Sequence, residues 1–300
     1  MKLALSGASG FIGRHVLSEL ARQEIKPVVI LRPDADAPDF LCQYRMVRID
    51  IANTGPDAYA QLGCPDVLIH LAWGGLPNYR SLHHFERELP AHYAFLKGLV
   101  VAGLPHLVVS GTCFEYGMQS GPLGEDLPTA PANPYGLAKD SLRRQLEQLR
   151  RLHPFSMVWA RLFYLYGQAQ ALGSLLPLLR RAVERGDTVF PMSGGQQLRD
   201  YLDVAEAARQ LVALARGARD VGVVNVCSGQ PISVRSLVEG WIEEHAWSIT
   251  PALGCHPYPE HEPMAFWGDR SKFDRLQARA ESERAPSRPH PHPLSTLPKR

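Results

Sequence analysis

The first 22 residues contain the feature that most restricts how this chain can fold: an apolar run, a glycine-rich turn and an amphipathic segment in direct succession. Residues 2–6 are mostly apolar, which predicts a short strand buried inside a parallel sheet. Gly7, Gly10 and Gly13 follow in the spacing G-x-x-G-x-x-G. Residues 14–22 then repeat apolar side chains at helical spacing. We therefore expect a strand, a tight turn and a helix, the first unit of an alternating α/β fold.

This order of elements gives the glycine turn a chemical meaning. Glycines allow the backbone to approach a pyrophosphate closely, and the N-terminus of the following helix offers N–H donors to the phosphates. The strand before the turn and the helix after it distinguish a dinucleotide-binding turn from an ordinary glycine-rich one. We therefore predict a dinucleotide site here, with these contacting residues: Gly7, Ser9, Gly10, Phe11, Ile12 and Gly13.

A second pattern lies in the middle of the chain, where Tyr135 and Lys139 follow Asn133 and Pro134. Asn133 is suited to cap a helix that starts at Pro134, and residues at i and i+4 share one helix face. A cation close to a phenol favours the ionised form and lowers the pKa, so the tyrosine could transfer protons near neutral pH. The same pair alone is also compatible with a surface contact. The upstream glycine turn favours the catalytic interpretation.

Together these patterns resemble the extended short-chain dehydrogenase/reductase superfamily, and within it the NAD(P)-dependent nucleotide-sugar epimerase/dehydratase/reductase family. The similarity extends from residue 1 to about residue 276. It implies a Rossmann-type doubly wound parallel sheet with a smaller α/β C-terminal substrate domain. Further motifs occur in the family's order, at 50–51, 70–73, 110–117, 161–167, 199–204, 225–229 and 268–272.

The resemblance also implies a division of the chain. Residues 1–167, with a returning segment near 200–228, are expected to form the NAD(P)-binding domain. Residues 168–199 and 229–278 are expected to form the smaller nucleotide-sugar domain. Residues 279–300 are rich in proline and charge, which favours a disordered tail. Helices near 88–102 and 135–152 correspond to those that pair across dimers in the family, so a homodimer is expected.

For the cofactor, the resemblance places the adenosine ribose at the end of the second strand. Leu31 stands where NAD-dependent members carry an acidic residue, and Arg32 follows it. An arginine there accommodates the 2′-phosphate of NADP, so NADP(H) is favoured over NAD(H). Arg32 could instead be a solvated loop residue. Four more residues are implied to line the cofactor: Asp50 and Ile51 at the adenine, and Leu71 and Ala72 towards the nicotinamide ribose.

The resemblance assigns the catalytic roles to three residues. Thr112 would hold the sugar oxygen, Tyr135 would give or take the proton, and Lys139 would bind the nicotinamide ribose and depress the tyrosine pKa. Dehydratases of the family carry an Asp-Glu pair at the next two positions, where this chain has Cys113 and Phe114. This substitution argues against a 4,6-dehydratase. Cys113 itself is interpreted as a small buried residue rather than an acid or base.

Two residues are implied to contact the substrate. Tyr164 replaces the asparagine that contacts the sugar or diphosphate in the family, so it marks the pocket but leaves its specificity open. Arg199 corresponds to the arginine that grips the nucleotide diphosphate, a role that suits the planar guanidinium. Arg199 could instead form a salt bridge with Asp200 or Asp203.

Through this resemblance, these residues imply an NAD(P)H-dependent reductase of a nucleotide-linked 4-keto-6-deoxy sugar, of the kind that supplies activated deoxysugars for surface polysaccharides. A nucleotide-sugar 4-epimerase with retained NAD would use the same residues and is the alternative. A non-catalytic NAD(P)-binding regulator or scaffold is a third interpretation, which the presence of both Tyr135 and Lys139 disfavours.

The composition of the chain argues against several classes of partner and of binding site. The formal net charge of +2 argues against binding to nucleic acid or to a membrane surface, and no apolar run approaches the length of a membrane span. The chain starts directly with a strand, so no signal peptide is expected. Five cysteines, with no Cys-x-x-Cys spacing, argue against a disulfide framework or a zinc site. We therefore expect a cytoplasmic enzyme without a metal, and the family resemblance implies that its partner is a nucleotide-diphosphate sugar.

Overall fold

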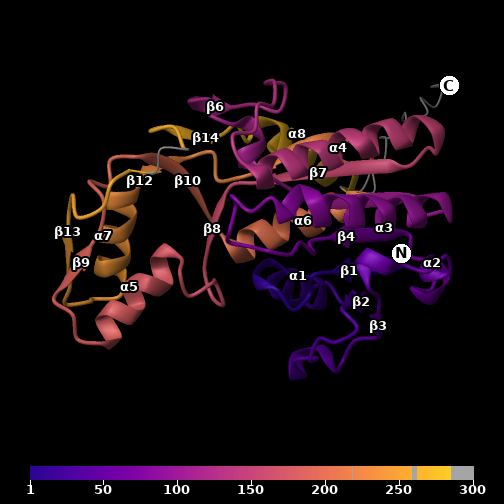
Figure 1. The fold of residues 1–300 in the computed structure, drawn as a ribbon, viewed down its shortest axis with the longest axis horizontal. Helices are drawn as coiled ribbons and strands as arrows, with labels where there is room; N and C mark the ends of the chain where they lie inside the picture. The colour runs from indigo at the N-terminus through magenta and orange to yellow at the C-terminus, as the bar shows by residue number, and fades with distance from the viewer. Residues whose placement is uncertain (218, 259–261, 285–300) are drawn as a thin grey trace, which may run out of the picture.

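Seven parallel strands form the central sheet of the protein, seen in a computed structural model that describes residues 1–217, 219–258 and 262–284 (Figure 1). Their order across the sheet is β11-β7-β5-β4-β1-β2-β3. The order reverses between β1 and β4, and in such sheets ligands bind at the carboxyl ends of the strands beside this point. The predicted Rossmann-type sheet is therefore confirmed. The strands are β1 (Leu3–Ser6), β2 (Val28–Leu31), β3 (Met46–Arg48), β4 (Val67–His70), β5 (His106–Thr112), β7 (Ser156–Leu162) and β11 (Gly222–Val226).

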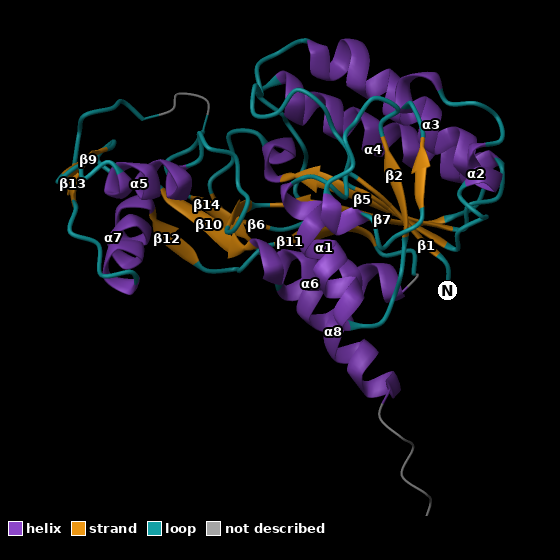
Figure 2. Cartoon of the chain, turned by 90° about the horizontal axis from the view of Figure 1, so that it is seen from below, coloured by secondary structure: helices purple, strands orange, loops and turns teal. Residues whose placement is uncertain are grey.

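Helices cover both faces of this sheet (Figure 2). One face packs against α1 (Phe11–Arg22), α6 (Val204–Gly217) and α8 (Ser271–Arg284). The other packs against α3 (Leu89–Val101) and α4 (Pro134–Leu152), with the short α2 (Ala58–Gln61) beside them. Because both faces are buried, the inner strands read as continuous apolar runs. The apolar stripe of α4 belongs to this core, where Leu142, Leu146 and Leu149 are buried.

A smaller unit lies beyond the carboxyl ends of the strands (Figures 1 and 2). Its three-stranded sheet has the order β12-β10-β8, and a second pair joins β13 to β9. Two helices, α5 (Leu175–Glu184) and α7 (Val234–Glu244), pack into one apolar cluster with these strands. The strands are β8 (Tyr164–Tyr166), β9 (Val189–Pro191), β10 (Leu198–Asp203), β12 (Pro231–Ser233) and β13 (Thr250–Ala252). A further pair, β6 (Gly121–Leu123) with β14 (Phe266–Gly268), connects the two units.

The domain boundaries in the structure differ from the expected ones. The segments 164–166 and 198–203 pair with each other in the small sheet, so the smaller unit begins before residue 168 and extends past residue 200. Residues 271–278 pack with the large domain instead of the small one. Phe273 of α8 lies in the core beside α6, and Lys272 Nζ donates to the carbonyls of Val221 and Val223 at 2.8 and 2.6 Å.

The expected disorder after residue 278 is wrong for its first six residues, because α8 continues to Arg284. Residues 277–284 contain no proline, and charged or polar side chains four apart support the helix, as between Arg279 and Glu283 and between Gln277 and Glu281. Arg219 adds an ion pair to Glu283 from outside the helix. Residues 285–300 lie outside the described part of the chain. Among the helices of the described residues, none is both long and apolar enough to cross a membrane.

Candidate active site

The glycine turn after β1 lies against the end of β4. Gly7 has φ of +74°, a left-handed conformation that favours glycine, and a Cβ there would lie 2.8 Å from the backbone nitrogen of Ala72. A Cβ on Gly13 would lie 2.0 Å from the carbonyl oxygen of Gly7. Gly10, the N-cap of α1, has no side chain to accept the first N–H groups of the helix. The turn therefore has the shape and the donors that a pyrophosphate needs.

The end of β2 presents the predicted adenosine side of the site. Arg32 directly follows β2 and is exposed. Arg48 of β3 fixes the backbone after it by donating to the carbonyls of Arg32, Pro33 and Ala35 at 3.2, 2.5 and 2.9 Å. Asp50 is exposed, and its carboxylate accepts from the Ala52 N–H at 3.0 Å, which leads into a short turn that starts at Ile51.

The predicted catalytic residues meet at the start of α4 and the end of β5. Asn133 caps α4 by accepting from the Gly136 N–H at 2.8 Å, and Pro134 is the first helical residue, as predicted. Tyr135 and Lys139 are 8% and 1% exposed, so they are not a surface pair. Thr112 ends β5, is 6% exposed, and is hydrogen-bonded to the Tyr135 side chain.

Lys139 lies in an aromatic and largely dry environment. Its Nζ donates to the Ser110 carbonyl at 2.9 Å and lies 4.0 Å from the centre of the Trp73 ring. Burial lowers the pKa of Lys139 to about 7, although the carboxylates of Glu115 and Glu88 act to raise it. The ammonium is therefore held mainly by a carbonyl and an indole face, with two carboxylates further away.

The expectation that Lys139 depresses the pKa of Tyr135 does not hold for the protein's own groups. Burial raises the pKa of Tyr135 above its ordinary value of 10, Tyr79, Glu115 and Cys113 add to the effect, and the Thr112 hydrogen bond opposes it. Lys139 Nζ lies 5.9 Å from the centre of the tyrosine ring. The reason is desolvation, which spacing along the sequence does not reveal. Tyr135 is therefore a protonated donor in this environment.

The turn that presents Thr112 is held by a buried carboxylate that the sequence analysis did not assign to the site. Glu115 is fully buried and accepts from the Thr112 N–H at 2.9 Å, from Trp159 Nε1 at 2.9 Å and from Arg161 Nε at 2.7 Å. Burial raises the pKa of Glu115, and the adjacent Arg161 opposes that rise. Thr112 in turn accepts from the Phe114 N–H, which completes a capping box. Glu115 therefore holds the backbone of Thr112 in place through its N–H group.

Cys113 and Phe114 do not provide acid–base chemistry. Cys113 is 5% exposed, and burial raises the pKa of its thiol well above the ordinary range, in agreement with its interpretation as a small buried residue. The Phe114 ring lies 5.0 Å from Tyr79, 6.4 Å from Tyr135 and 6.3 Å from Tyr164, measured between ring centres. Phe114 therefore joins Tyr135 of α4 and Tyr164 of β8 in one aromatic cluster.

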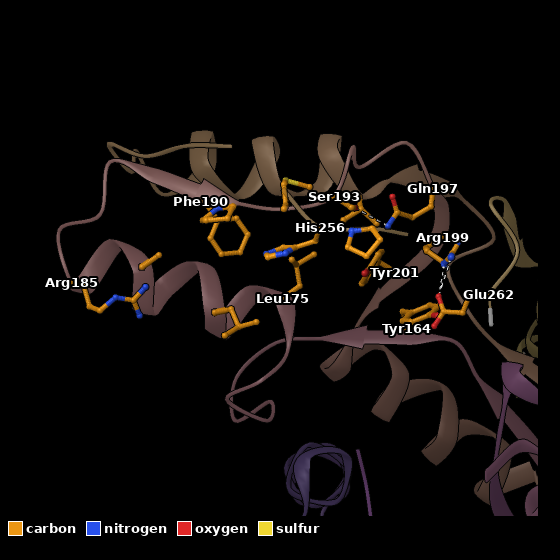
Figure 3. Close-up of a pocket in the computed structure, with 16 residues that line it drawn as sticks. Tyr164, Leu175, Arg185, Phe190, Ser193, Gln197, Arg199, Tyr201, His256 and Glu262 are labelled. Atoms are coloured by element: carbon orange, nitrogen blue, oxygen red, sulfur yellow. Dashed lines mark hydrogen bonds and ion pairs between the residues drawn. The ribbon is translucent and has the colours of Figure 1, made fainter. Parts of the chain in front are cut away.

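A pocket of about 500 Å³ opens in the smaller unit (Figure 3). Apolar side chains from α5, β9 and α7 form one part of its lining, and polar groups of the β10 region form another. Tyr164 and Arg199, both predicted to contact substrate, line it together with Glu262. The lining residues are Tyr164, Leu175, Leu178, Ala182, Arg185, Phe190, Pro191, Met192, Ser193, Gln197, Arg199, Tyr201, Val234, His256, Pro257 and Glu262.

Arg199 pairs with a residue that the sequence analysis did not consider. Its guanidinium contacts Glu262 Oε2 at 3.0 Å and lies 4.6 Å from the centre of the Phe266 ring. The alternative salt bridge to Asp200 or Asp203 is not formed. Asp200 accepts from the backbone N–H groups of Ser228, Gly229 and Gly268, whereas Asp203 accepts from the Ala205 N–H at the start of α6. Arg199 therefore lines the pocket as the partner of Glu262 in an ion pair.

Other pocket residues, such as Phe190, Gln197 and Glu262, were also not identified from the sequence. They come from separate strands and loops, and none belongs to a motif with a chemical signature. Only the tertiary structure brings them together. Within the described ranges, no group of three or more His, Cys, Asp or Glu side chains is arranged to hold a metal ion.

Comparisons with known proteins agree with this geometry. Residues 3–227 match the model of the NAD dependent epimerase/dehydratase family. The chain is 30% identical to dTDP-6-deoxy-L-talose 4-dehydrogenase (NAD(+)) of Aggregatibacter actinomycetemcomitans, over 89% of this chain and 99% of that protein. It is 27% identical to dTDP-6-deoxy-L-talose 4-dehydrogenase (NAD(P)(+)) of Kitasatospora kifunensis, over 81% of this chain and 79% of that one.

Solved structures agree as well. The structure of MoeE5 in complex with UDP-glucuronic acid and NAD superposes with a TM-score of 0.77 at 26% identity, and the alignment covers 93% of each chain. The glycine turn, the tyrosine–lysine pair on α4 and the matched family model all lead to one assignment. The chain belongs to the NAD dependent epimerase/dehydratase family of extended short-chain dehydrogenases/reductases, whose members act on nucleotide sugars, and it is an NAD(P)-dependent enzyme.

Proposed function

We propose that this protein reduces a nucleotide-linked 4-keto-6-deoxy sugar with NAD(P)H. The observation that carries the proposal is the buried group of Thr112, Tyr135 and Lys139 beside the glycine turn, with Cys113 and Phe114 where an acid–base pair would be needed for dehydration. The similarity to a 4-dehydrogenase of dTDP-6-deoxy-L-talose supports the same chemistry, because that reaction in reverse is reduction of a 4-keto sugar.

The chain's own residues fit this reaction. The nicotinamide, when bound, supplies the hydride to C4. Tyr135 donates its phenolic proton to the C4 oxygen, which becomes the hydroxyl, and Thr112 orients that oxygen. The pKa of Tyr135 is raised by burial, which keeps the phenol protonated as a proton donor requires. Lys139, at the base of the site, would hold the ribose of the cofactor. One proton from solvent restores the tyrosine after each turnover.

The pocket in Figure 3 is proposed to hold the nucleotide of the substrate. Arg199 would bind the diphosphate through its planar guanidinium, in exchange for part of its contact with Glu262. Gln197 is 8% exposed, and its Oε1 makes no hydrogen bond within the described residues, so it can accept an N–H of the base. The apolar side chains of Leu175 and Phe190 supply the surface on which a base can pack.

We also propose NADP(H) as the preferred cofactor. Arg32 is exposed at the end of β2, and Arg48 fixes the backbone that carries it. Replacing Arg32 by alanine is expected to weaken NADPH binding at least about tenfold, because one charged hydrogen bond to the 2′-phosphate is lost. NADH binding should stay unchanged, since NADH lacks that phosphate. Isothermal titration calorimetry measures both affinities. Arg22→Ala, at an exposed arginine of α1, is the control. Equal weakening of both cofactors would contradict the assignment.

A homodimer through α3 and α4 is part of the proposal, as the family resemblance implies. Val101 of α3 and Leu137 of α4 are 53% and 45% exposed, so each helix presents an apolar side chain outwards. Burial of such side chains in a shared helical interface would stabilise the pair.

The bound cofactor and the stoichiometry of turnover distinguish a reductase from a 4-epimerase. The purified protein is expected to consume one NADPH for each 4-keto-6-deoxy sugar reduced, followed by absorbance at the reduced nicotinamide band. An epimerase would instead retain NAD⁺ through purification and interconvert two nucleotide sugars without net cofactor consumption. That second result would replace the reductase assignment. Cofactor binding without turnover on any nucleotide sugar would favour a non-catalytic role.

A further inference from the structure

A buried hydrogen-bonded chain runs behind the catalytic lysine. Ser6 Oγ lies 2.8 Å from His70 Nδ1, His70 Nε2 lies 2.7 Å from His92 Nδ1, and His92 Nε2 lies 3.0 Å from Glu88 Oε2. The first two residues end strands β1 and β4, and His92 is on α3. Ser6 and His70 are fully buried and His92 is 3% exposed. The mechanism above uses none of these side chains.

The acceptor at the end of this chain fixes its direction. Glu88 is an ionised carboxylate: burial alone would raise its pKa, but hydrogen bonds from His92 and from the Gly74 N–H lower it to about 2. A carboxylate only accepts, so His92 Nε2 carries a hydrogen. Burial lowers the pKa of both His92 and His70, so both rings are neutral and each Nδ1 is an acceptor. Ser6 therefore donates to His70, His70 donates to His92, and His92 donates to Glu88.

Glu88 also fixes the loop that carries Trp73. Its carboxylate accepts from the Gly74 N–H at 2.6 Å and pairs with His83 Nε2 at 2.9 Å. The His92 ring stacks on Trp73, with 4.6 Å between ring centres and 17° between ring planes. The Lys139 ammonium also lies over the indole ring, 4.0 Å from the ring centre. An unbroken series of contacts therefore joins Glu88 to Lys139 through His92 and Trp73.

We propose that Glu88 is a positioning residue for the catalytic lysine: it holds the His92–Trp73 platform on which the Lys139 ammonium rests, and its negative charge favours the charged form of that side chain. Burial works against the charge of Lys139, and no carboxylate in the described part of the chain forms an ion pair with its Nζ. Among the described residues, Glu115 and Glu88 are the carboxylates that raise the pKa of Lys139. This inference rests on the proposed role of Lys139 in catalysis.

Other titratable groups face Lys139 and must be considered with Glu88. His70 on β4 and His92 on α3 are both coupled to it, but both are neutral. Tyr135 lies on the same helix and is protonated. Glu115, behind β5, is engaged by Arg161, which offsets its charge at 2.7 Å. The side-chain partners of Glu88 are the imidazoles of His83 and His92, so Glu88 can be substituted without leaving a buried guanidinium unpaired.

The test is an NMR titration of the full-length protein labelled with ¹³C at the lysine ε-carbon, with Lys139→Arg used to assign the resonance. In Glu88→Gln, the titration midpoint of Lys139 should move to lower pH by about one pH unit, because a favourable neighbouring charge is lost. Glu88→Asp keeps the charge and should restore a midpoint near that of the unmodified protein. Glu86→Gln, at an exposed neighbour on the same turn, should leave it unchanged. An unchanged midpoint in Glu88→Gln overturns the proposal.

Two further measurements, a pH profile of activity and histidine NMR spectra, also test the proposal. In the pH profile of kcat/KM, the alkaline loss of activity should begin at lower pH in Glu88→Gln, which a purely structural role would not produce. If no keto sugar is turned over, the proposed function fails, whereas the lysine titration still decides this inference. If Glu88→Gln does not fold, ¹⁵N-histidine spectra of the unmodified protein apply. They should show His70 and His92 as neutral Nε2–H tautomers, and an Nδ1–H tautomer at His92 would overturn the proposal.

Discussion

Replacing Tyr135 by phenylalanine is expected to lower turnover at least about 100-fold, because the general acid is lost while the ring remains. Cofactor binding should be nearly unchanged. The phenylalanine ring keeps its packing against Tyr79 and Trp73, whose ring centres lie 5.5 and 6.1 Å away. Steady-state kinetics with NADPH and a 4-keto-6-deoxy sugar measure the first effect, and cofactor titration measures the second.

A matched control separates this chemistry from packing. Tyr44 is as buried as Tyr135, at 8% exposed, but it lies between β2 and β3 in the core of the other face of the sheet. Tyr44→Phe should therefore leave turnover nearly unchanged. Retention of full activity in Tyr135→Phe would mean that another group delivers the proton. In that case the assigned mechanism would be wrong, even though the family assignment would stand.

Replacing Glu115 by alanine is expected to reduce the free energy of unfolding by about 3–5 kcal/mol. The substitution leaves the Arg161 guanidinium, which is 1% exposed, without its carboxylate partner. It also removes the acceptor of the Thr112 N–H and of the Trp159 indole N–H. Turnover should fall as well, because Thr112 loses the capping box that orients it. Urea unfolding followed by circular dichroism measures the stability change.

Two comparisons make this prediction specific to the buried pair. Arg161→Met alone should cost a similar amount, but the double variant Glu115→Ala/Arg161→Met should cost clearly less than the sum of the two single changes. Glu147→Ala, which breaks a more exposed ion pair with Arg143 on α4, should cost no more than about 1 kcal/mol. Additive losses at Glu115 and Arg161 would show that the two side chains do not stabilise each other.

Much of the large domain could be predicted from local sequence, for identifiable reasons. The turn at Gly7, Gly10 and Gly13 requires glycine because a Cβ at the first or last would collide with backbone. Asn133 and Pro134 are adjacent in the chain and fix the start of α4, which places Tyr135 and Lys139 on one face. Parallel strands bring the ends of β1, β4 and β5 to one edge of the sheet, where motifs far apart in the sequence meet.

Burial and long-range pairing could not be predicted in the same way. The pKa of Tyr135 depends on desolvation by side chains from several elements, so the four-residue spacing to Lys139 gives the wrong direction for the isolated protein. Glu262 pairs with Arg199 although 63 residues separate them in the sequence, and no local pattern predicts that pair. The continuation of α8 over residues 279–284 was not predicted, because the composition was judged over the whole tail. The prolines that follow this segment made the tail as a whole unfavourable for a helix.

The sequence by itself determined the fold class, the glycine turn and the identity of the tyrosine–lysine pair, because each depends on residues that are neighbours in the chain. The tertiary structure alone decided the protonation of that pair, the buried carboxylates Glu88 and Glu115 behind it, and the pocket around Arg199. These properties arise from solvent exclusion and from contacts between distant segments. Both are set only when the sheet, its helices and the smaller unit are packed together.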